Sequence, residues 1–386
     1  MSAGPHRIAL CGAGGFARNA HLPAIAGTDY LELAAVYSRS LDSVNTLIEA
    51  TKSYQATSHD LGIYSDDPSS ESFDALLARS DIPTVVFALP IATQPAMVER
   101  ALRAGKNVIS EKPIAPSLDE AKRLIELYER EFRPKGQQWI VAEQFPWEKS
   151  YCKASEWVKA GKVGEVRSFS AEVFVQPSAL ASATGWRQAP DYQGGFILDG
   201  GVHFVAGLRH ILPYPITSVF ASASQIQPSL PPCDTLTGIL TATPPASPSS
   251  SSLPITGTIS FSFGTESCST RRYVISGSKA LLTVDFGDRK QHVVTLRTPP
   301  SSPDEDDPHE LVVEFSQRGV EEEFDAFGQA LFEGPDSEAA REVARRSGPR
   351  ATLRDLGVIE GALKSSRDKV VVDLRELVGG SEWFDY

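Results

Sequence analysis

The sequence has few cysteines and no histidine spacing that is typical of a metal site. Its four cysteines, Cys11, Cys152, Cys233 and Cys268, lie far apart and form no CxxC pair. This pattern is typical of reduced thiols rather than of a disulfide framework or a zinc site. The seven histidines show no HxxxH or HExxH spacing. We therefore expect a protein of a reducing compartment, the cytoplasm, without a bound metal.

Long apolar runs and an excess of basic residues are also missing. No run of 18 apolar residues occurs, so we expect no membrane-spanning segment. The first residues lack the charged and apolar regions of a signal peptide. The net charge is −12, from 37 basic against 49 acidic residues, which speaks against binding to nucleic acid. The sequence therefore predicts a soluble protein whose ligands are small molecules.

The length of 386 residues is too great for one ordinary hydrophobic core, so we expect two domains. Hydrophobic residues at 41% and charged residues at 22% are typical of globular proteins. Two low-complexity stretches, 244–252 and 298–308, hold too few apolar residues to join a core and are expected to be loops. The pattern of strands and helices changes after residue 145, so we expect domains over 1–145 and 146–386.

Predicted strands and helices alternate strictly through the first of these domains. Short apolar runs at 7–11, 31–37, 84–89, 107–110 and 139–142 are separated by segments with helical spacing. Such alternation predicts an α/β domain with a doubly wound parallel sheet.

A glycine-rich turn follows the first predicted strand. Gly12-Ala13-Gly14-Gly15-Phe16-Ala17 matches the pattern G-x-G-x-x-A between a strand and a helix. Gly12 allows the tight turn, and Gly14 lets the backbone approach a pyrophosphate at the helix N-terminus. The context makes this the fingerprint of a dinucleotide-binding Rossmann domain. Its expected cofactor-contacting residues are Gly12, Gly14, Gly15 and Phe16.

The residues after the second predicted strand bear on the choice between NADP(H) and NAD(H). An acidic residue often stands here in NAD-binding folds, where it accepts the ribose hydroxyls. This chain has Ser38-Arg39-Ser40 instead, with no acid before Asp42. An arginine and a hydroxyl can hold a 2′-phosphate that a carboxylate would repel. We therefore expect Ser38 and Arg39 to bind NADP(H), with NAD(H) the less favoured cofactor.

The second half has a different pattern. Segments 166–175, 216–224, 256–264 and 273–284 alternate apolar and polar residues, as half-buried antiparallel strands do. A helix is expected over 202–211. We therefore expect an N-terminal Rossmann sheet followed by an α+β domain with an open, largely antiparallel sheet.

Three motifs resemble those of the glucose-fructose oxidoreductase/inositol dehydrogenase (Gfo/Idh/MocA) family. Glu111-Lys112-Pro113 follows a predicted strand, Trp186-Arg187 comes later, and Asp199 precedes His203 by four residues. The motifs have the family's order and spacing over nearly the whole chain, closest to a fungal NADP(H)-linked cytosolic branch. The resemblance implies a dehydrogenase that exchanges a hydride with a small carbonyl, polyol or sugar-like substrate.

The resemblance also implies roles for individual residues. His203 is the expected acid/base, Asp199 is expected to hold substrate hydroxyls and the histidine, and Lys112 to stabilise alkoxide charge. Glu111, Lys112 and Pro90 are expected to contact the cofactor. The expected substrate pocket comprises Glu143, Gln144, Trp186, Arg187, Asp199 and His203.

One segment departs from the family pattern. Many members have asparagine after the proline that ends the fourth strand, and a histidine shortly afterwards. Here the segment reads Pro90-Ile91-Ala92-Thr93-Gln94, which puts the local contacts to the nicotinamide in doubt.

The sequence leaves two alternative functions open, and it also predicts an oligomeric state. Some family members are cofactor-sensing regulators without turnover, and others retain NAD as a redox relay for hydrolysis or elimination. The presence of Lys112, Asp199 and His203 favours an enzyme.

The polar face of the second sheet carries serines and an aromatic residue, Phe174, rather than many charges. We therefore expect a homodimer formed through this sheet.

Overall fold

A computed structural model describes residues 4–54, 57–176, 185–244, 253–265, 269–286, 291–300 and 309–384, without the side chains of 57–59 and Trp186. Most of the two low-complexity stretches, and Cys268, lie outside this part of the chain. The backbone forms two compact units. The first comprises residues 1–147 and 319–353, and the second residues 148–318 and 354–386.

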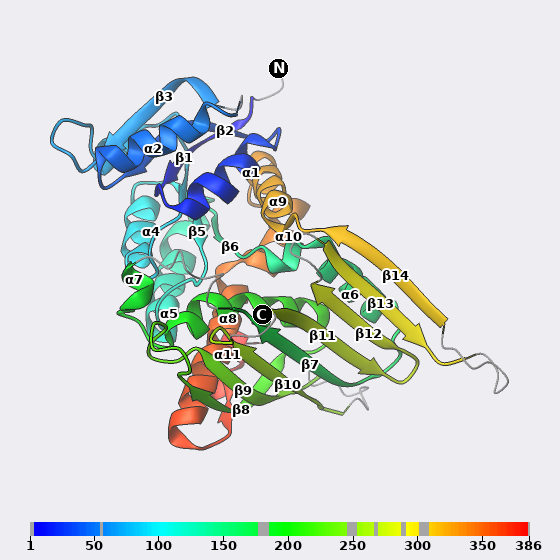
Figure 1. Ribbon diagram of the computed structural model, residues 1–386. Helices are drawn as coiled ribbons and strands as arrows, with labels where there is room; N and C mark the ends of the chain where they lie inside the picture. Colours follow the sequence, from blue (N-terminus) through cyan, green and yellow to red (C-terminus); the bar gives the residue numbers. More distant parts are fainter. Residues whose placement is uncertain are drawn as a thin grey trace. The chain divides into compact units, whose positions relative to one another are not determined.

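The first unit is built on a parallel sheet of six strands in the order β3-β2-β1-β4-β5-β6 (Figure 1). The strands are β1 (His6–Cys11), β2 (Leu31–Ser38), β3 (Thr57–Ser65), β4 (Thr84–Phe87), β5 (Asn107–Glu111) and β6 (Trp139–Ala142). This order is that of the doubly wound dinucleotide-binding fold, which confirms the expected Rossmann sheet. Sequence analysis missed β3, whose residues do not form an apolar run.

Helices connect these strands. They are η1 (Ala17–His21), α1 (Leu22–Ala26), α2 (Leu41–Thr51), α3 (Phe73–Leu77), α4 (Gln94–Arg103), α5 (Leu118–Leu127), η2 (Tyr128–Phe132), η3 (Arg133–Lys135) and η4 (Phe145–Trp147). The side chains of Ser40, Ser72 and Ser117 cap α2, α3 and α5. The Ser40 hydroxyl accepts the Ser43 N–H at 3.3 Å, and the Ser117 hydroxyl accepts the Glu120 N–H at 3.3 Å.

Two helices from late in the chain belong to the first unit. On α9 (Gly319–Glu333), Phe324 and Phe327 are fully buried in the same core as residues of β1 and β2. From α10 (Glu338–Ser347), the Ser347 hydroxyl accepts the Trp147 indole N–H at 2.7 Å. The compact units therefore differ from the expected division at residue 145, because residues 319–353 return to the first unit. The helical pattern of a segment does not reveal which sheet it covers.

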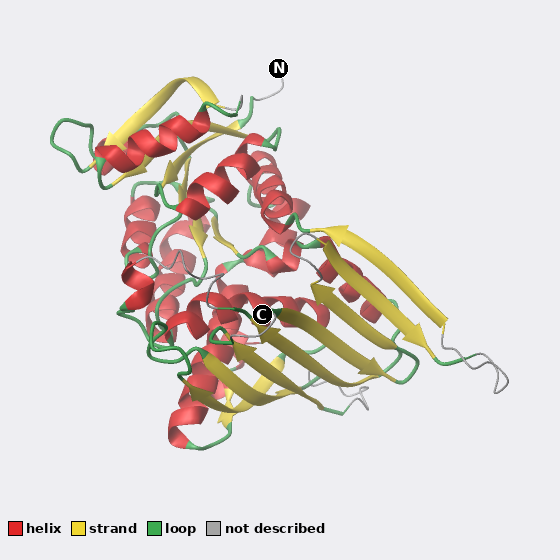
Figure 2. Ribbon diagram, viewed as in Figure 1, coloured by secondary structure: helices red, strands yellow, loops and turns green. Residues whose placement is uncertain are grey.

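The second unit contains a nine-stranded sheet in the order β14-β13-β12-β11-β7-β10-β9-β8-β15. β7 and β10 pair in parallel, and the other described pairs are antiparallel. Figure 2 shows these strands as a broad array. Their bounds are β7 (Val166–Phe174), β8 (Ile216–Ser224), β9 (Thr235–Ala242), β10 (Ile255–Ser262), β11 (Thr270–Gly277), β12 (Leu281–Phe286), β13 (Gln291–Thr298), β14 (His309–Ser316) and β15 (Val372–Asp373). The open, largely antiparallel sheet is confirmed.

One predicted strand proves to be a hairpin. Residues 273–284 do not form a single strand, because the chain turns between β11 and β12, where the Gly277 N–H donates to the Ala280 carbonyl at 3.0 Å. A Cβ at Gly277 would lie 2.2 Å from the Val163 carbonyl oxygen, so only glycine fits this turn. The apolar alternation on both sides of the turn concealed it. Strands β9, β13, β14 and β15 were not predicted.

The helices of this unit include the one that carries two predicted catalytic residues. They are α6 (Lys149–Lys159), α7 (Gly185–Gln188), α8 (Gly195–Ile211), most of α11 (Pro349–Asp368), α12 (Leu374–Val378) and α13 (Ser381–Phe384). The expected helix over 202–211 begins earlier, at Gly195. A Cβ at Gly200 would lie 3.0 Å from the Phe263 ring, and one at Gly201 would lie 3.1 Å from Ile359. Close packing thus explains glycines that oppose helix formation in isolation.

No helix in the described ranges is both long enough and apolar enough to cross a membrane.

Candidate active site

The glycine-rich turn after β1 has the shape that a pyrophosphate requires. Gly12 has φ +115°, and a Cβ there would lie 2.3 Å from the Ala88 carbonyl oxygen. An L-residue at position 12 would therefore be both strained and in collision with the backbone after β4. At Gly14 and Gly15 an added Cβ would meet no atom within 4 Å, so the space over the turn is open. Phe16 follows, with 46% of its surface exposed. The turn fits a dinucleotide phosphate at a helix N-terminus.

The predicted 2′-phosphate site lies after β2. Ser38 is half-buried, while Arg39 is exposed and forms no hydrogen bond or ion pair with any residue that the structure describes. Ser40 is engaged as the cap of α2. At the end of neighbouring β3, the Asp66 carboxylate accepts the Tyr37 hydroxyl at 2.9 Å. Burial, together with this carboxylate, raises the pKa of Tyr37. Sequence analysis missed Asp66 because it follows β3, a strand that was not predicted.

Three side chains hold the Glu111-Lys112-Pro113 turn, where β5 ends. Glu111 Oε1 lies 2.6 Å from His21 Nε2, and Glu111 Oε2 accepts the Lys112 N–H at 3.2 Å. Gln94, which is 1% exposed, donates its amide N–H to the carbonyls of Glu111 and Pro113. Gln94 belongs to the segment 90–94, which departs from the family pattern. Its side chain therefore links that segment directly to the turn. Neither His21 nor Gln94 was predicted, although Gln94 belongs to that divergent segment.

The other predicted residues of the first unit lie near the same edge of the sheet, because parallel strands end together. Pro90 is half-buried after β4. Glu143 directly follows β6, is 1% exposed and accepts the Phe145 N–H at 3.1 Å. Gln144 is half-buried, and its carbonyl accepts the Trp147 N–H at 2.9 Å. Glu143 therefore stabilises the local turn, whether or not it also contacts a ligand.

In the second unit, α8 places Asp199 and His203 one helical turn apart. Asp199 is 3% exposed, and its Oδ2 accepts the Arg187 Nε–H at 2.6 Å. His203 is half-buried. The ion pair fixes a buried carboxylate beside a partly exposed guanidinium. Trp186 lies in α7 beside Arg187, and its side chain is outside the described part of the structure.

A tyrosine that was not predicted lies in the same region. Tyr192 is 7% exposed. Burial raises its pKa, the Asp199 carboxylate raises it further, and Arg187 opposes the change. The phenol therefore stays protonated and can donate a hydrogen bond in the presence of the Asp199 charge. The available signal was its position between Arg187 and Asp199, but a tyrosine in such a segment is usually a packing residue.

The start of α8 is held by a loop from elsewhere in the unit. Gly194 and Gly195 have φ of +75° and +50°. A Cβ at Gly195 would lie 2.2 Å from the Pro231 carbonyl oxygen, so this loop closes against the helix. The fully buried Asp234 carboxylate fixes the loop by accepting the Gln227 N–H at 2.6 Å. Packing of this loop therefore helps to set the direction in which α8 presents its side chains.

Comparisons with known proteins identify the family. Residues 6–133 match an oxidoreductase family with an NAD-binding Rossmann fold, GFO_IDH_MocA, and residues 151–283 match the GFO/IDH/MocA C-terminal domain. Dehydrogenase FPY6 from Fusarium mangiferae is 34% identical over 367 residues, which cover 93% of this chain and 96% of FPY6. The chain belongs to the Gfo/Idh/MocA family. It is an NAD(P)-dependent oxidoreductase, as the sequence predicts.

Solved structures of this fold agree along nearly the whole chain. An oxidoreductase from Thermotoga maritima is 25% identical, with a TM-score of 0.75 over 97% of this chain and 99% of that protein. KijD10, a 3-ketoreductase from Actinomadura kijaniata in complex with NADP, is 22% identical, with a TM-score of 0.68 over 94% and 97%. At this identity the second likeness concerns the fold alone.

Proposed function

We propose that this oxidoreductase uses NADP(H) and transfers a hydride between the nicotinamide and a small carbonyl, polyol or sugar-like substrate. The observation that carries the cofactor choice is Arg39, exposed after β2 and without a partner among the described residues. A guanidinium in this state is available to bind a doubly charged 2′-phosphate through two N–H groups. Asp66, which follows the neighbouring strand β3, already accepts the Tyr37 hydroxyl. KijD10, a protein of this fold, binds NADP.

In this proposal Lys112, Asp199 and His203 are the catalytic residues. The nicotinamide supplies or accepts the hydride when the cofactor is bound. Lys112 places a cation at the substrate oxygen, where negative charge develops. His203 donates a proton to that oxygen in reduction and accepts it in oxidation. Asp199, held by Arg187, accepts hydrogen bonds from substrate hydroxyls and orients the histidine.

The proposed substrate class follows from the polar groups of the second unit. Arg187 and Tyr192 are donors and Asp199 is an acceptor, a combination that suits neighbouring hydroxyls and a carbonyl better than an apolar ligand. KijD10, a protein of this fold, is described as a 3-ketoreductase, which agrees with a carbonyl substrate. Glu143, Gln144 and Trp186 remain predicted pocket residues. The free thiols of Cys11, Cys152 and Cys233 suit the proposed cytoplasmic location.

A substrate panel tests the function. We expect the purified protein to oxidise NADPH, or reduce NADP, with at least one member of a panel of aldehydes, ketones, sugars and polyols, as followed by NADPH absorbance. NADPH binding without turnover on any member would favour a cofactor-sensing regulator. An absorbance spectrum that shows stoichiometric nicotinamide in the protein as purified, with no net redox change, would favour a retained-cofactor reaction.

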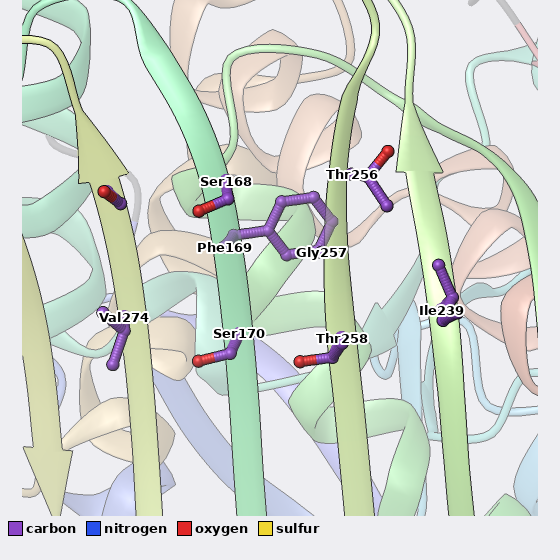
Figure 3. A pocket seen from close by; sticks show the side chains of 9 residues that line it. Ser168, Phe169, Ser170, Ile239, Thr256, Gly257, Thr258 and Val274 are labelled. Atoms are coloured by element: carbon purple, nitrogen blue, oxygen red, sulfur yellow. The ribbon is translucent and has the colours of Figure 1, made fainter.

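We also propose a homodimer formed through the open face of the second sheet. Figure 3 shows hydroxyl side chains in register on this face, with Ser168 beside Thr256 and Ser170 beside Thr258. Ile239 and Val274 flank the second pair, and these residues are among those that line a hollow of about 400 Å³. Ile239 is 50% exposed, and Phe220 on the neighbouring strand is 44% exposed. Covering the exposed apolar groups with a second copy removes them from water, and the small hydroxyls can form hydrogen bonds with those of the partner.

Charge placed on this face should separate the subunits. We expect light scattering of the native chain to give about twice 41.7 kDa, and Ser170→Arg/Thr258→Arg to give the monomer mass, since buried like charges would face each other across the two-fold axis. Thr46→Arg, on an exposed position of α2 in the first unit, is the matched control and should leave the mass unchanged. A native mass near 41.7 kDa at micromolar concentration would exclude the dimer.

A further inference from the structure

His21 occupies an unusual place for a histidine that carries no predicted role. It lies at the end of η1, the helix that begins at the glycine-rich turn, and its side chain is completely buried. Its Nε2 is 2.6 Å from Glu111 Oε1, across 90 residues of sequence. An ionised carboxylate only accepts hydrogen bonds, so Nε2 is the donor. One side chain thus joins the helix that follows the proposed phosphate-binding turn to the turn that carries Lys112.

The direction of this hydrogen bond is set by packing. The Phe16 ring meets the His21 ring edge-on at 5.1 Å between centroids, and the Phe324 ring lies 5.0 Å away. The other ring nitrogen, Nδ1, is buried without a hydrogen-bond partner among the described residues. An imidazole between two aromatic rings, with a single polar contact, has one favoured orientation. That orientation aims Nε2 at the Glu111 carboxylate.

The Glu111 carboxylate also contacts the backbone of Lys112. Its second oxygen, Oε2, accepts the Lys112 backbone N–H at 3.2 Å. The same carboxylate therefore bonds His21 on one side and the Lys112 backbone on the other. We propose that His21 is a positioning residue, which fixes Glu111 and through it the backbone from which the Lys112 ammonium is presented. This inference rests on the proposed catalytic role of Lys112 and does not require His21 to touch a ligand.

Kinetics of variants test this role. We expect His21→Leu to lower kcat about 10-fold or more, because small displacements of a catalytic group are costly, while Kd for NADPH changes less than about 3-fold. His21→Gln retains an N–H donor near the position of Nε2 and should recover most of the loss. In a Lys112→Ala background, His21→Leu should have little further effect, because the group it positions is gone. An equal loss with and without Lys112 would overturn the proposal, as would a His21→Gln variant no better than His21→Leu.

A second measurement does not depend on turnover. Hydrogen exchange of the Lys112 amide in the cofactor-free protein, measured by mass spectrometry, should rise about 10-fold or more in His21→Leu and in Glu111→Leu. Unchanged exchange in His21→Leu would overturn the proposal. His6→Leu is the matched control, because it removes a 2.7 Å side-chain hydrogen bond between His6 and Thr84. His6 is the first residue of β1, at the end away from the glycine-rich turn. It should leave Lys112 exchange and kcat unaltered, and changes as large as those of His21→Leu would mean general destabilisation. If the native protein shows no turnover, the proposed function fails while the exchange result still stands.

Discussion

Alanine at Lys112, Asp199 or His203 is expected to lower turnover by about 10²-fold or more in each case, while NADPH still binds. Each substitution removes a group that we place at the reacting oxygen or its proton, where interactions are stronger in the transition state than in the ground state. Steady-state kinetics with the best substrate of the panel, together with a fluorescence titration of NADPH, measures both quantities.

The three residues should also behave as a unit. The double variant Lys112→Ala/His203→Ala is expected to lose far less than the product of the two single losses. Asp199→Asn is the control for packing, since it keeps the shape of the side chain that accepts from Arg187 while removing its charge. Near-normal activity of His203→Ala at every pH would refute the acid/base assignment. A loss of turnover in the double variant equal to the product of the two single losses would refute a shared step.

Arg39→Asp is expected to weaken NADPH binding about 10- to 100-fold, the range for losing a charge-assisted pair at an exposed site. The new carboxylate would also face the 2′-phosphate with like charge. NADH lacks this phosphate, so its Kd should stay the same or improve, which makes it the internal control. Arg39→Lys should lie between the native protein and Arg39→Asp, because an ammonium keeps the charge but loses the planar fork.

Equal NADPH affinity in the native chain and Arg39→Asp would remove the argument for NADP(H). A parallel loss of NADH affinity would indicate instead that the substitution disturbs α2, which begins two residues later at Leu41. Titrations of both cofactors against the same variant therefore separate recognition of the 2′-phosphate from local unfolding.

Local patterns were enough where one short segment carries the whole signal. The strand over 139–142 was predicted with its observed bounds, and β8 likewise, because each is a short run with clear ends. The glycine-rich turn needed only its own residues and the strand before it. The spacing of Asp199 and His203 is a local property that puts them one turn apart in a helix, although the expected helix over 202–211 did not include Asp199.

Predictions failed where the decisive contact is distant in sequence. The early start of α8 is linked to Phe263 and Ile359, because Gly200 packs closely against the first and Gly201 against the second. The turn in 273–284 depends on Val163. Neither partner is visible from the helical or strand pattern of the segment itself, so intrinsic propensity was a poor guide there.

By itself the sequence determined the parallel dinucleotide-binding sheet, the antiparallel sheet that follows it, and the family motifs, because periodicity and turn chemistry act between residues close in the chain. Only the tertiary structure decided that residues 319–353 complete the first unit and that His21 and Gln94 hold the Glu111-Lys112-Pro113 turn. It also decided that Tyr192 lies in the field of Asp199. The reason is physical: a buried polar group must find a partner in space, and sequence separation does not limit which partner it finds.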